Sequence, residues 1–257
     1  MDYLSVEQAR TRKGLRLVLT AGGPGPWGEA AKGFFAVKEI EWTPVLQEPG
    51  GENRALLEWT GQTLAPVAIL DDEPPLPVLS DILWLAERLA PEPALVPGDL
   101  RERTEMFGLL REITGQHGLG SSRRLVMLGA NLERQPAGPE REWSERFAKK
   151  FRWSAEAVEP ARRRVMEILA FLSRCLRDQR ERGRRFLVGT ELSAVDIAWA
   201  AFAAMFDPLP EDVCPMSKGL RRMYTEKDPE VLAVLDPLLL EHRDALYRDF
   251  LGLPIDF

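Results

Sequence analysis

The residues that build metal and disulfide sites are scarce in this sequence. The two cysteines, Cys175 and Cys214, form no Cys-x-x-Cys pair and lie far apart, so no disulfide framework is indicated. The two histidines, His117 and His242, are too few and too scattered for a recognisable zinc site. We therefore expect free, buried thiols and no metal.

Excess positive charge and long apolar runs are also missing. The formal net charge is −6, which disfavours nucleic acid as a partner, because binding of phosphates requires a surplus of Lys and Arg. No apolar run approaches the roughly 18 residues that indicate a membrane span, and the start "MDYLSVEQARTRKG" has no apolar signal-peptide core. These absences predict a cytoplasmic protein with no nucleic-acid or membrane partner.

The loop "TAGGPGPWGEAAKG", residues 20–33, lacks reactive side chains. From residue 21 to 31 it holds no Ser, Thr, Tyr, Cys or His. The segment "AGGPG" does not have the Gly-x-Gly-x-x-Gly spacing of a dinucleotide site, and no Gly-x-x-x-x-Gly-Lys-[Ser/Thr] phosphate loop occurs. The function of this loop therefore has to come from its backbone or from neighbouring residues.

The first part of the chain alternates strand and helix patterns. The 257 residues, 45% of them hydrophobic, suffice for one large or two small domains. Apolar spacing predicts strands or helices in the order βαβαββα, at residues 15–19, 26–40, 42–47, 53–61, 65–70, 75–79 and 80–90. Helices could cover a four-stranded sheet in this order, with Ser80 as the N-cap of the last helix.

The second part has helical periodicity and no strand signal. Residues 91–98, "PEPALVPG", read as a linker between a first domain, 1–93, and an all-helical second domain, 99–257. In "ELSAVDIAWAAFAAMF", Ser193 and Asp196 can form a capping box that starts a buried helix. Trp42, Trp59, Trp84 and Trp199 lie in regular elements and are expected to pack in the core.

These elements together resemble the glutathione S-transferase superfamily, with bacterial-type members in particular. The resemblance rests on the βαβαββα half, the proline entering "APVAIL", the linker, the helical half and the Ser-x-x-Asp helix start in "FLVGTELSAVDIAWA". It implies an α/β plus all-α fold, in which a thioredoxin-like domain binds glutathione and a helical bundle domain lines a pocket for a hydrophobic electrophile. It also implies a homodimer, with the first domain of one protomer packed on the second domain of the other.

The resemblance assigns glutathione-binding roles to several positions. Ala65 and Pro66 correspond to the family's cis-proline site, where an outward-facing backbone pairs with glutathione like an added strand; a trans proline at a sheet edge is the alternative. Asp81 matches the acidic residue of the family's γ-glutamyl anchor, and Ile82 stands where the family has Ser. Half of that anchor is therefore absent.

The resemblance places the thiol-activating Tyr, Ser or Cys in the loop of residues 20–33. Here Gly25 precedes Pro26, and Trp27 follows, so the expected hydroxyl or thiol is missing. One hypothesis is that Gly25 admits the sulfur and that the amides of Trp27 and residue 28, with the helix dipole, lower its pKa. The nearest candidate side chain is Thr20, for which a local hydrogen bond at the strand end is the alternative.

Two functions remain open at this point. The chain is either a transferase that conjugates glutathione, as co-substrate, to a hydrophobic electrophile, or a non-catalytic binder of glutathione or a hydrophobic ligand with the same fold. A disulfide reductase would need a Cys at the first helix of the fold, where there is none. Arg123 and Arg124 could face the cleft between the domains and bind an anion, or form a solvated surface pair.

Overall fold

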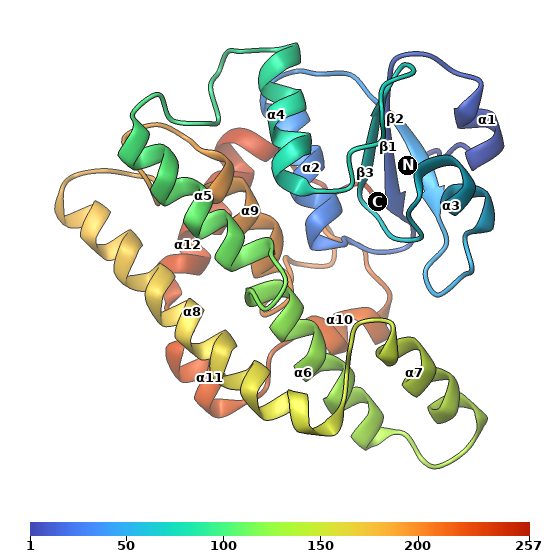
Figure 1. Ribbon diagram of the computed structural model, residues 1–257. Coiled ribbons are helices and arrows are strands. Elements are labelled where there is room, and N and C mark those ends of the chain that lie inside the picture. The colour runs from blue at the N-terminus through green and yellow to red at the C-terminus, as the bar shows by residue number, and fades with distance from the viewer.

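The computed structural model describes the backbone of residues 1–257 and every side chain except that of Trp143. The strands and four helices form one part of the molecule, and the other part consists of helices and loops (Figure 1). The first part contains α1 (Val6–Arg10), β1 (Leu15–Thr20), α2 (Pro26–Val37), β2 (Thr43–Gln47), α3 (Arg54–Thr60), β3 (Val67–Leu70) and α4 (Leu79–Leu89). The second part contains α5 (Leu100–Thr114), α6 (Leu119–Arg134), α7 (Pro139–Lys149), α8 (Ala155–Glu181), α9 (Ala194–Ala203), α10 (Lys218–Tyr224), α11 (Pro229–Val234), α12 (Pro237–Leu246) and a π-helical end, η1 (Tyr247–Leu251).

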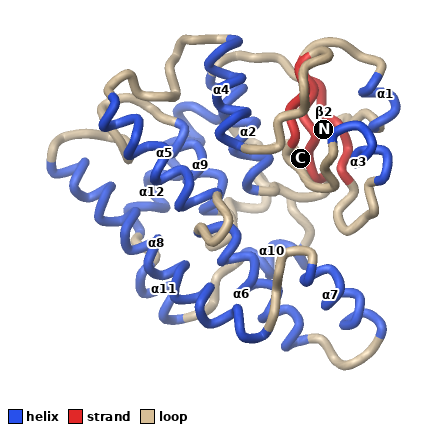
Figure 2. Tube along the Cα trace, in the orientation of Figure 1, coloured by secondary structure: helices blue, strands red, loops and turns tan.

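The sheet has the strand order β2-β1-β3, with β1 at its centre. Strand β1 runs parallel to β2 and antiparallel to β3, and Val18 pairs with Val45 on one side and Val67 on the other. Since side chains alternate along a strand, Leu17 and Leu19 pack with α2 and α4, whereas Val18 packs toward α1 and α3. Figure 2 shows the sheet between these two pairs of helices.

The expected fourth strand is reduced to a single bridge. Leu76 exchanges two backbone hydrogen bonds with Ala68, with N–O distances of 2.8 and 3.0 Å. In an antiparallel ladder the next hydrogen-bonded pairs would join residue 74 to residue 70 and residue 78 to residue 66. Pro74 and Pro66 have no N–H to donate, so the ladder does not extend on either side of Leu76. The mixed α/β fold class is confirmed, with three strands in place of four.

Helices α2 and α9 join the two parts. A Cβ at Gly33 would lie 2.5 Å from Cγ2 of Ile197, so this glycine allows the helices to approach closely. Buried residues of both parts form one continuous hydrophobic cluster. The segment between the two parts is also held, because the amide of Ala194 donates to the carbonyl of Leu95 at 2.9 Å.

The expected capping box at the start of α9 is present. Oδ2 of Asp196 accepts from the amide of Ser193 at 3.1 Å and from its hydroxyl at 2.9 Å. Oδ1 accepts from the amide of Leu187 at 2.9 Å and lies 2.9 Å from Nε2 of His242. Asp196 and His242 are buried, so this carboxylate joins three segments of the helical part inside the core.

Two local expectations are wrong. The N-cap of α4 is Val78 and not Ser80, because the helix begins at Leu79, two residues before the start that a cap at Ser80 implies, and it has no side-chain cap. Trp199 is fully buried as expected, but Trp84 is 48% exposed, since it lies on the outer face of α4. Among the described residues, no helix is both long and apolar enough to cross a membrane.

Candidate functional site

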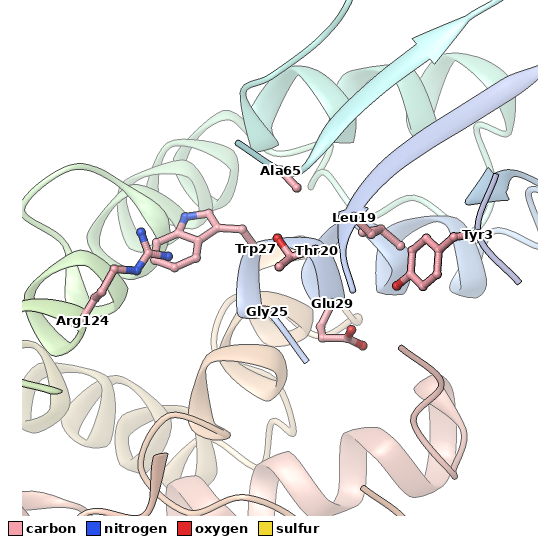
Figure 3. A pocket seen from close by; sticks show the side chains of 9 residues that line it. Tyr3, Leu19, Thr20, Gly25, Trp27, Glu29, Ala65 and Arg124 are labelled. Atoms are coloured by element: carbon pink, nitrogen blue, oxygen red, sulfur yellow. The ribbon is translucent and has the colours of Figure 1, made fainter. Parts of the chain in front are cut away.

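A cleft of about 430 Å³ lies where the loop before α2 meets the helical part. Its first wall includes Thr20, Gly25, Pro26 and Ala65. The opposite wall comes from α6, from the segment around α7, from the turn that follows α9 and from α10. Its side chains are Arg124, Met127, Leu128, Phe147, Phe151, Met205, Leu220, Met223 and Tyr224. A smaller pocket, also bordered by Thr20, Gly25, Ala65 and Arg124, adjoins it and adds Trp27 (Figure 3).

The N-terminus of α2 presents backbone donors at this site. Gly25 is the N-cap, Pro26 occupies the first turn, and no side chain caps the helix. The amides of Trp27 and Gly28 lie in this uncapped turn, where a helix has a partial positive charge. A Cβ at Gly25 would meet no atom within 4 Å, so the space beside this residue is open. The turn can therefore accept an anionic or strongly polar atom without competition from a cap.

The hydroxyl of Thr20 is already engaged. It donates to Oε1 of Gln47 at 2.7 Å. The amide group of Gln47 is oriented by its own Nε2, which donates to the carbonyls of Glu48 at 2.9 Å and Thr63 at 3.3 Å. Because Oε1 must then face Thr20, the Thr20 proton is used in this bond. The local hydrogen bond considered for this residue is thus present, and its oxygen borders the cleft as an acceptor.

The peptide bond between Ala65 and Pro66 is cis, as the resemblance implies. Pro66 is buried, and Ala65 lies half-buried at the cleft, just before β3. Neither the amide nor the carbonyl of Ala65 is hydrogen bonded to another described residue. An extended ligand could therefore pair with this backbone as an added strand.

The expected anchor at the start of α4 lies apart from the cleft. Asp81 is exposed, whereas the side chain of Ile82 is fully buried in the core. Their amides both donate to the carbonyl of Val78, at 2.9 and 3.0 Å. Neither residue lines the two pockets described above. The structure thus brings together Thr20, Gly25, Pro26, Trp27 and Ala65, with Pro66 adjacent, but leaves Asp81 and Ile82 outside this group.

Trp27 forms the boundary between the loop and the helical part. Its Nε1 donates to the carbonyl of Thr114 at 2.7 Å, and its ring meets Phe202 edge to face, with centroids 4.7 Å apart. The guanidinium carbon of Arg124 lies 4.2 Å from the centroid of the Trp27 ring. The indole is therefore fixed in place as a wall of the site.

Polar residues absent from our sequence-based list close the far end of the small pocket. Glu29 pairs with Lys32 at 2.8 Å, and burial raises the pKa of this carboxyl. Tyr3 has a buried hydroxyl with no hydrogen-bond partner, and burial raises its pKa to about 12. Figure 3 shows the Tyr3 ring and the Glu29 carboxylate at this end. Tyr3 and Glu29 belong to no recognisable sequence motif, so their proximity follows from the fold alone.

Comparison with known proteins identifies the fold. Residues 155–238 match the glutathione S-transferase C-terminal domain. A glutathione S-transferase from Methylobacillus flagellatus, solved with glutathione bound, is 16% identical; the match covers 92% of this chain and 96% of that chain with a TM-score of 0.64. The nitrogen regulation fragment of the yeast prion protein Ure2p is 15% identical, covering 93% and 94%, with a TM-score of 0.63. No curated protein sequence matches this chain.

A third structure supports the same assignment. The glutathione S-transferase of Methylobacterium radiotolerans, in complex with glutathione sulfonate, is 20% identical over 95% of this chain and 97% of that chain, with a TM-score of 0.57. The resemblance to the glutathione S-transferase superfamily is confirmed at the level of the fold, and residues 155–238 of the helical part match the model of its C-terminal domain. At these identities the structural likeness defines the fold, and the function requires a separate argument.

Proposed function

We propose that this protein binds glutathione in the cleft and transfers it, through a stabilised thiolate, to a hydrophobic electrophile. The observation that carries this proposal is the unpartnered backbone of Ala65 beside the uncapped first turn of α2, on one wall of the same cleft. Similar proteins from Methylobacillus flagellatus and Methylobacterium radiotolerans were solved with glutathione or its sulfonate bound.

In this proposal the backbone of Ala65 pairs with the cysteinyl unit of glutathione, with Pro66 supporting that turn. The ligand sulfur then lies beside Gly25, where no Cβ takes up space. The amides of Trp27 and Gly28 and the dipole of α2 favour the thiolate over the thiol. Asp81 remains the proposed partner of the γ-glutamyl end of glutathione. The side chain of Ile82 is buried and cannot contribute to this contact.

Catalysis by this route has no side-chain donor at the sulfur. The sequence proposes Thr20 as the catalytic residue, but its hydroxyl would have to break the hydrogen bond to Gln47 before it could donate to a thiolate. Backbone amides stabilise an anion without this rearrangement. We therefore expect the thiol pKa to fall less than in an enzyme with a dedicated Tyr, Ser or Cys.

The second candidate is a non-catalytic binder of glutathione or a hydrophobic ligand. Two observations favour it: Gly25 replaces the reactive residue, and Ile82 replaces the serine of the anchor. The fragment of Ure2p, which has a similar fold, is described by its role in nitrogen regulation. The two candidates differ in the chemistry of the bound thiol and not in the fold.

Titration calorimetry with glutathione, followed by the thiolate absorbance of the complex against pH, tests both candidates. A transferase should bind glutathione and lower its thiol pKa below the value in free solution. S-methylglutathione, which has no ionisable thiol, is the control for binding alone. Binding without a lowered pKa would favour the non-catalytic function. Failure to bind either compound would contradict glutathione binding in both candidates and leave a binder of a hydrophobic ligand.

We also propose that the protein is a homodimer, as the resemblance implies. Trp84 of α4 is 48% exposed and stacks on Phe107 of α5, with ring centroids 5.7 Å apart. This aromatic pair joins the first and second parts of the chain on an outer surface, where a second copy could cover it. Light scattering should give twice the chain mass of 29.0 kDa at micromolar concentration. A species of 29.0 kDa would contradict the dimer.

A further inference from the structure

Two consecutive arginines on α6 have opposite environments. Arg123 is 3% exposed and fully partnered: its Nη1 lies 2.7 Å from Glu226, and its Nε donates to the carbonyl of Met205 at 2.8 Å. Arg124 is half-buried at the cleft and forms no hydrogen bond or ion pair with another described residue. None of its nitrogens is among the fully buried unpartnered atoms, so these donors stay open toward the cleft, where a ligand can reach them.

Two aromatic rings pack against the guanidinium group of Arg124 and leave its N–H groups accessible to a ligand. The guanidinium carbon lies 4.2 Å from the ring centroid of Trp27 and 4.5 Å from that of Phe151. Cation–π contacts of this kind hold the group in place and cover it with apolar surface. The N–H groups remain as donors, and the fork they form matches a planar, two-oxygen anion. Figure 3 shows Arg124 extending from α6 to the Trp27 ring.

Among the described residues no carboxylate forms an ion pair with Arg124, and Glu29, which borders the same small pocket, pairs with Lys32. Burial lowers the pKa of Arg124 to about 10, and an electrostatic interaction with Tyr224 acts in the opposite direction. Tyr224 is itself neutral near pH 7, because burial raises its pKa to about 12. Arg124 therefore remains a cation at neutral pH in a partly desolvated place, where an attraction to an anion is stronger than in water.

Most of the rest of this wall is apolar, and Ser217 and Tyr224 are its polar members. Met127, Leu128, Phe147, Leu220 and Met223 line the cleft beyond Arg124. A ligand that fills this space needs an apolar body and one negative end. We propose that Arg124 anchors the carboxylate, or a similar planar anion, of an otherwise apolar aromatic ligand in this cleft. The proposal deepens the proposed function, since this ligand would be the electrophile, but its binding can be measured without glutathione.

Titration calorimetry with 3,5-dinitrobenzoate and its neutral isostere 3,5-dinitrobenzamide tests the proposal. The parent protein should bind the carboxylate more tightly than the amide. Arg124→Gln should weaken dinitrobenzoate binding by about tenfold or more, the loss expected for charge-assisted hydrogen bonds, and leave dinitrobenzamide binding nearly unchanged. Arg124→Lys should recover only part of the affinity, because an ammonium cannot form the paired bonds or stack between rings.

Arg134→Gln is the matched control. Arg134 lies on the same helix, is exposed and lines neither pocket, so its removal changes the net charge equally. Melting curves verify that each variant is folded. Equal affinity of the parent for both probes, which needs no variant, would overturn the proposal. So would equal weakening by the Arg124 and Arg134 substitutions.

A further arm separates this proposal from the proposed function. If Arg124→Gln raises the thiol pKa of bound glutathione and leaves dinitrobenzoate binding unchanged, Arg124 serves the sulfur and the proposal is wrong. Selective binding of dinitrobenzoate through Arg124 supports the proposal even where glutathione does not bind. In that case the proposed function fails and the anion site stands.

Discussion

The start of α9 and the cleft beside α2 both place polar groups among apolar side chains, but they treat these groups differently. At the start of α9, the carboxylate of Asp196 has partners from Leu187, Ser193 and His242. In the cleft, the backbone of Ala65 and the guanidinium of Arg124 have no hydrogen-bond or ion-pair partner among the described residues, although Arg124 stacks on two aromatic rings. Satisfied polar groups of the first kind stabilise the fold, whereas open groups of the second kind are available to a ligand.

The largest effect should follow from Asp196→Ala. The substitution leaves buried donors of Leu187 and Ser193 without an acceptor and removes the partner of His242. We expect the free energy of unfolding to fall by about 3 kcal/mol or more, since each orphaned donor costs about 1–3 kcal/mol. Urea denaturation measures this loss. Ligand affinity per folded molecule should not change, and a lowered affinity with unchanged stability would break the comparison.

A second prediction concerns the open space at Gly25. Its backbone conformation, φ −64° and ψ 117°, suits any residue, and a Cβ meets nothing within 4 Å, so Gly25→Val should fold normally. The added side chain enters the proposed sulfur position and should weaken glutathione binding at least about tenfold, or about 1.4 kcal/mol. Calorimetry provides the measurement.

Gly25→Ser is the matched variant for this position. It adds a small hydroxyl where the resemblance places a reactive side chain, and we expect it to lower the thiol pKa of bound glutathione further than the parent does. Undiminished binding by Gly25→Val would place the sulfur elsewhere in the cleft. It would also remove the main reason for linking the glycine to the ligand.

Ser193→Ala should have a smaller effect than Asp196→Ala. The hydroxyl of Ser193 donates to Asp196 at 2.9 Å, but the carboxylate keeps its other partners after the substitution. Loss of this cap should reduce the free energy of unfolding by about 1 kcal/mol. The melting temperatures of the two variants check the order. Equal losses would mean that the hydroxyl, and not the carboxylate, organises the helix start.

The sequence patterns predict the elements of the first part because its strands and helices have clear periodicities. They overestimate the fourth strand, since apolar spacing does not register that Pro74 and Pro66, at the next hydrogen-bonded positions of the ladder, have no N–H to donate. They also miss α1, although Ser5 and Gln8 form a capping box there. The missed helix is five residues long, too short for an apolar repeat to be visible.

The candidate site is predicted less completely than the fold. Gly25, Pro26, Trp27 and Ala65 are named through the family resemblance, and the structure places them together at the cleft. The difference between Arg123 and Arg124 depends on Glu226, which is 103 residues away from Arg123 and contacts it only through the fold. No local pattern reports such a contact, so the sequence cannot tell which arginine is already neutralised.

The smallest effect should come from Thr20→Val, which tests whether the cleft uses a side chain or the backbone at the sulfur. Thr20 donates to Gln47, whose amide is oriented by the carbonyls of Glu48 and Thr63, so its proton is not offered to a ligand. The thiol pKa of bound glutathione should then change by less than about 0.3. The measurement is thiolate absorbance against pH for the parent, Thr20→Val and Thr20→Ser, of which the last keeps the hydroxyl. If the valine variant loses the lowered pKa and the serine variant retains it, the Thr20 hydroxyl activates the thiol. The open first turn of α2 then does not explain how the site stabilises a thiolate.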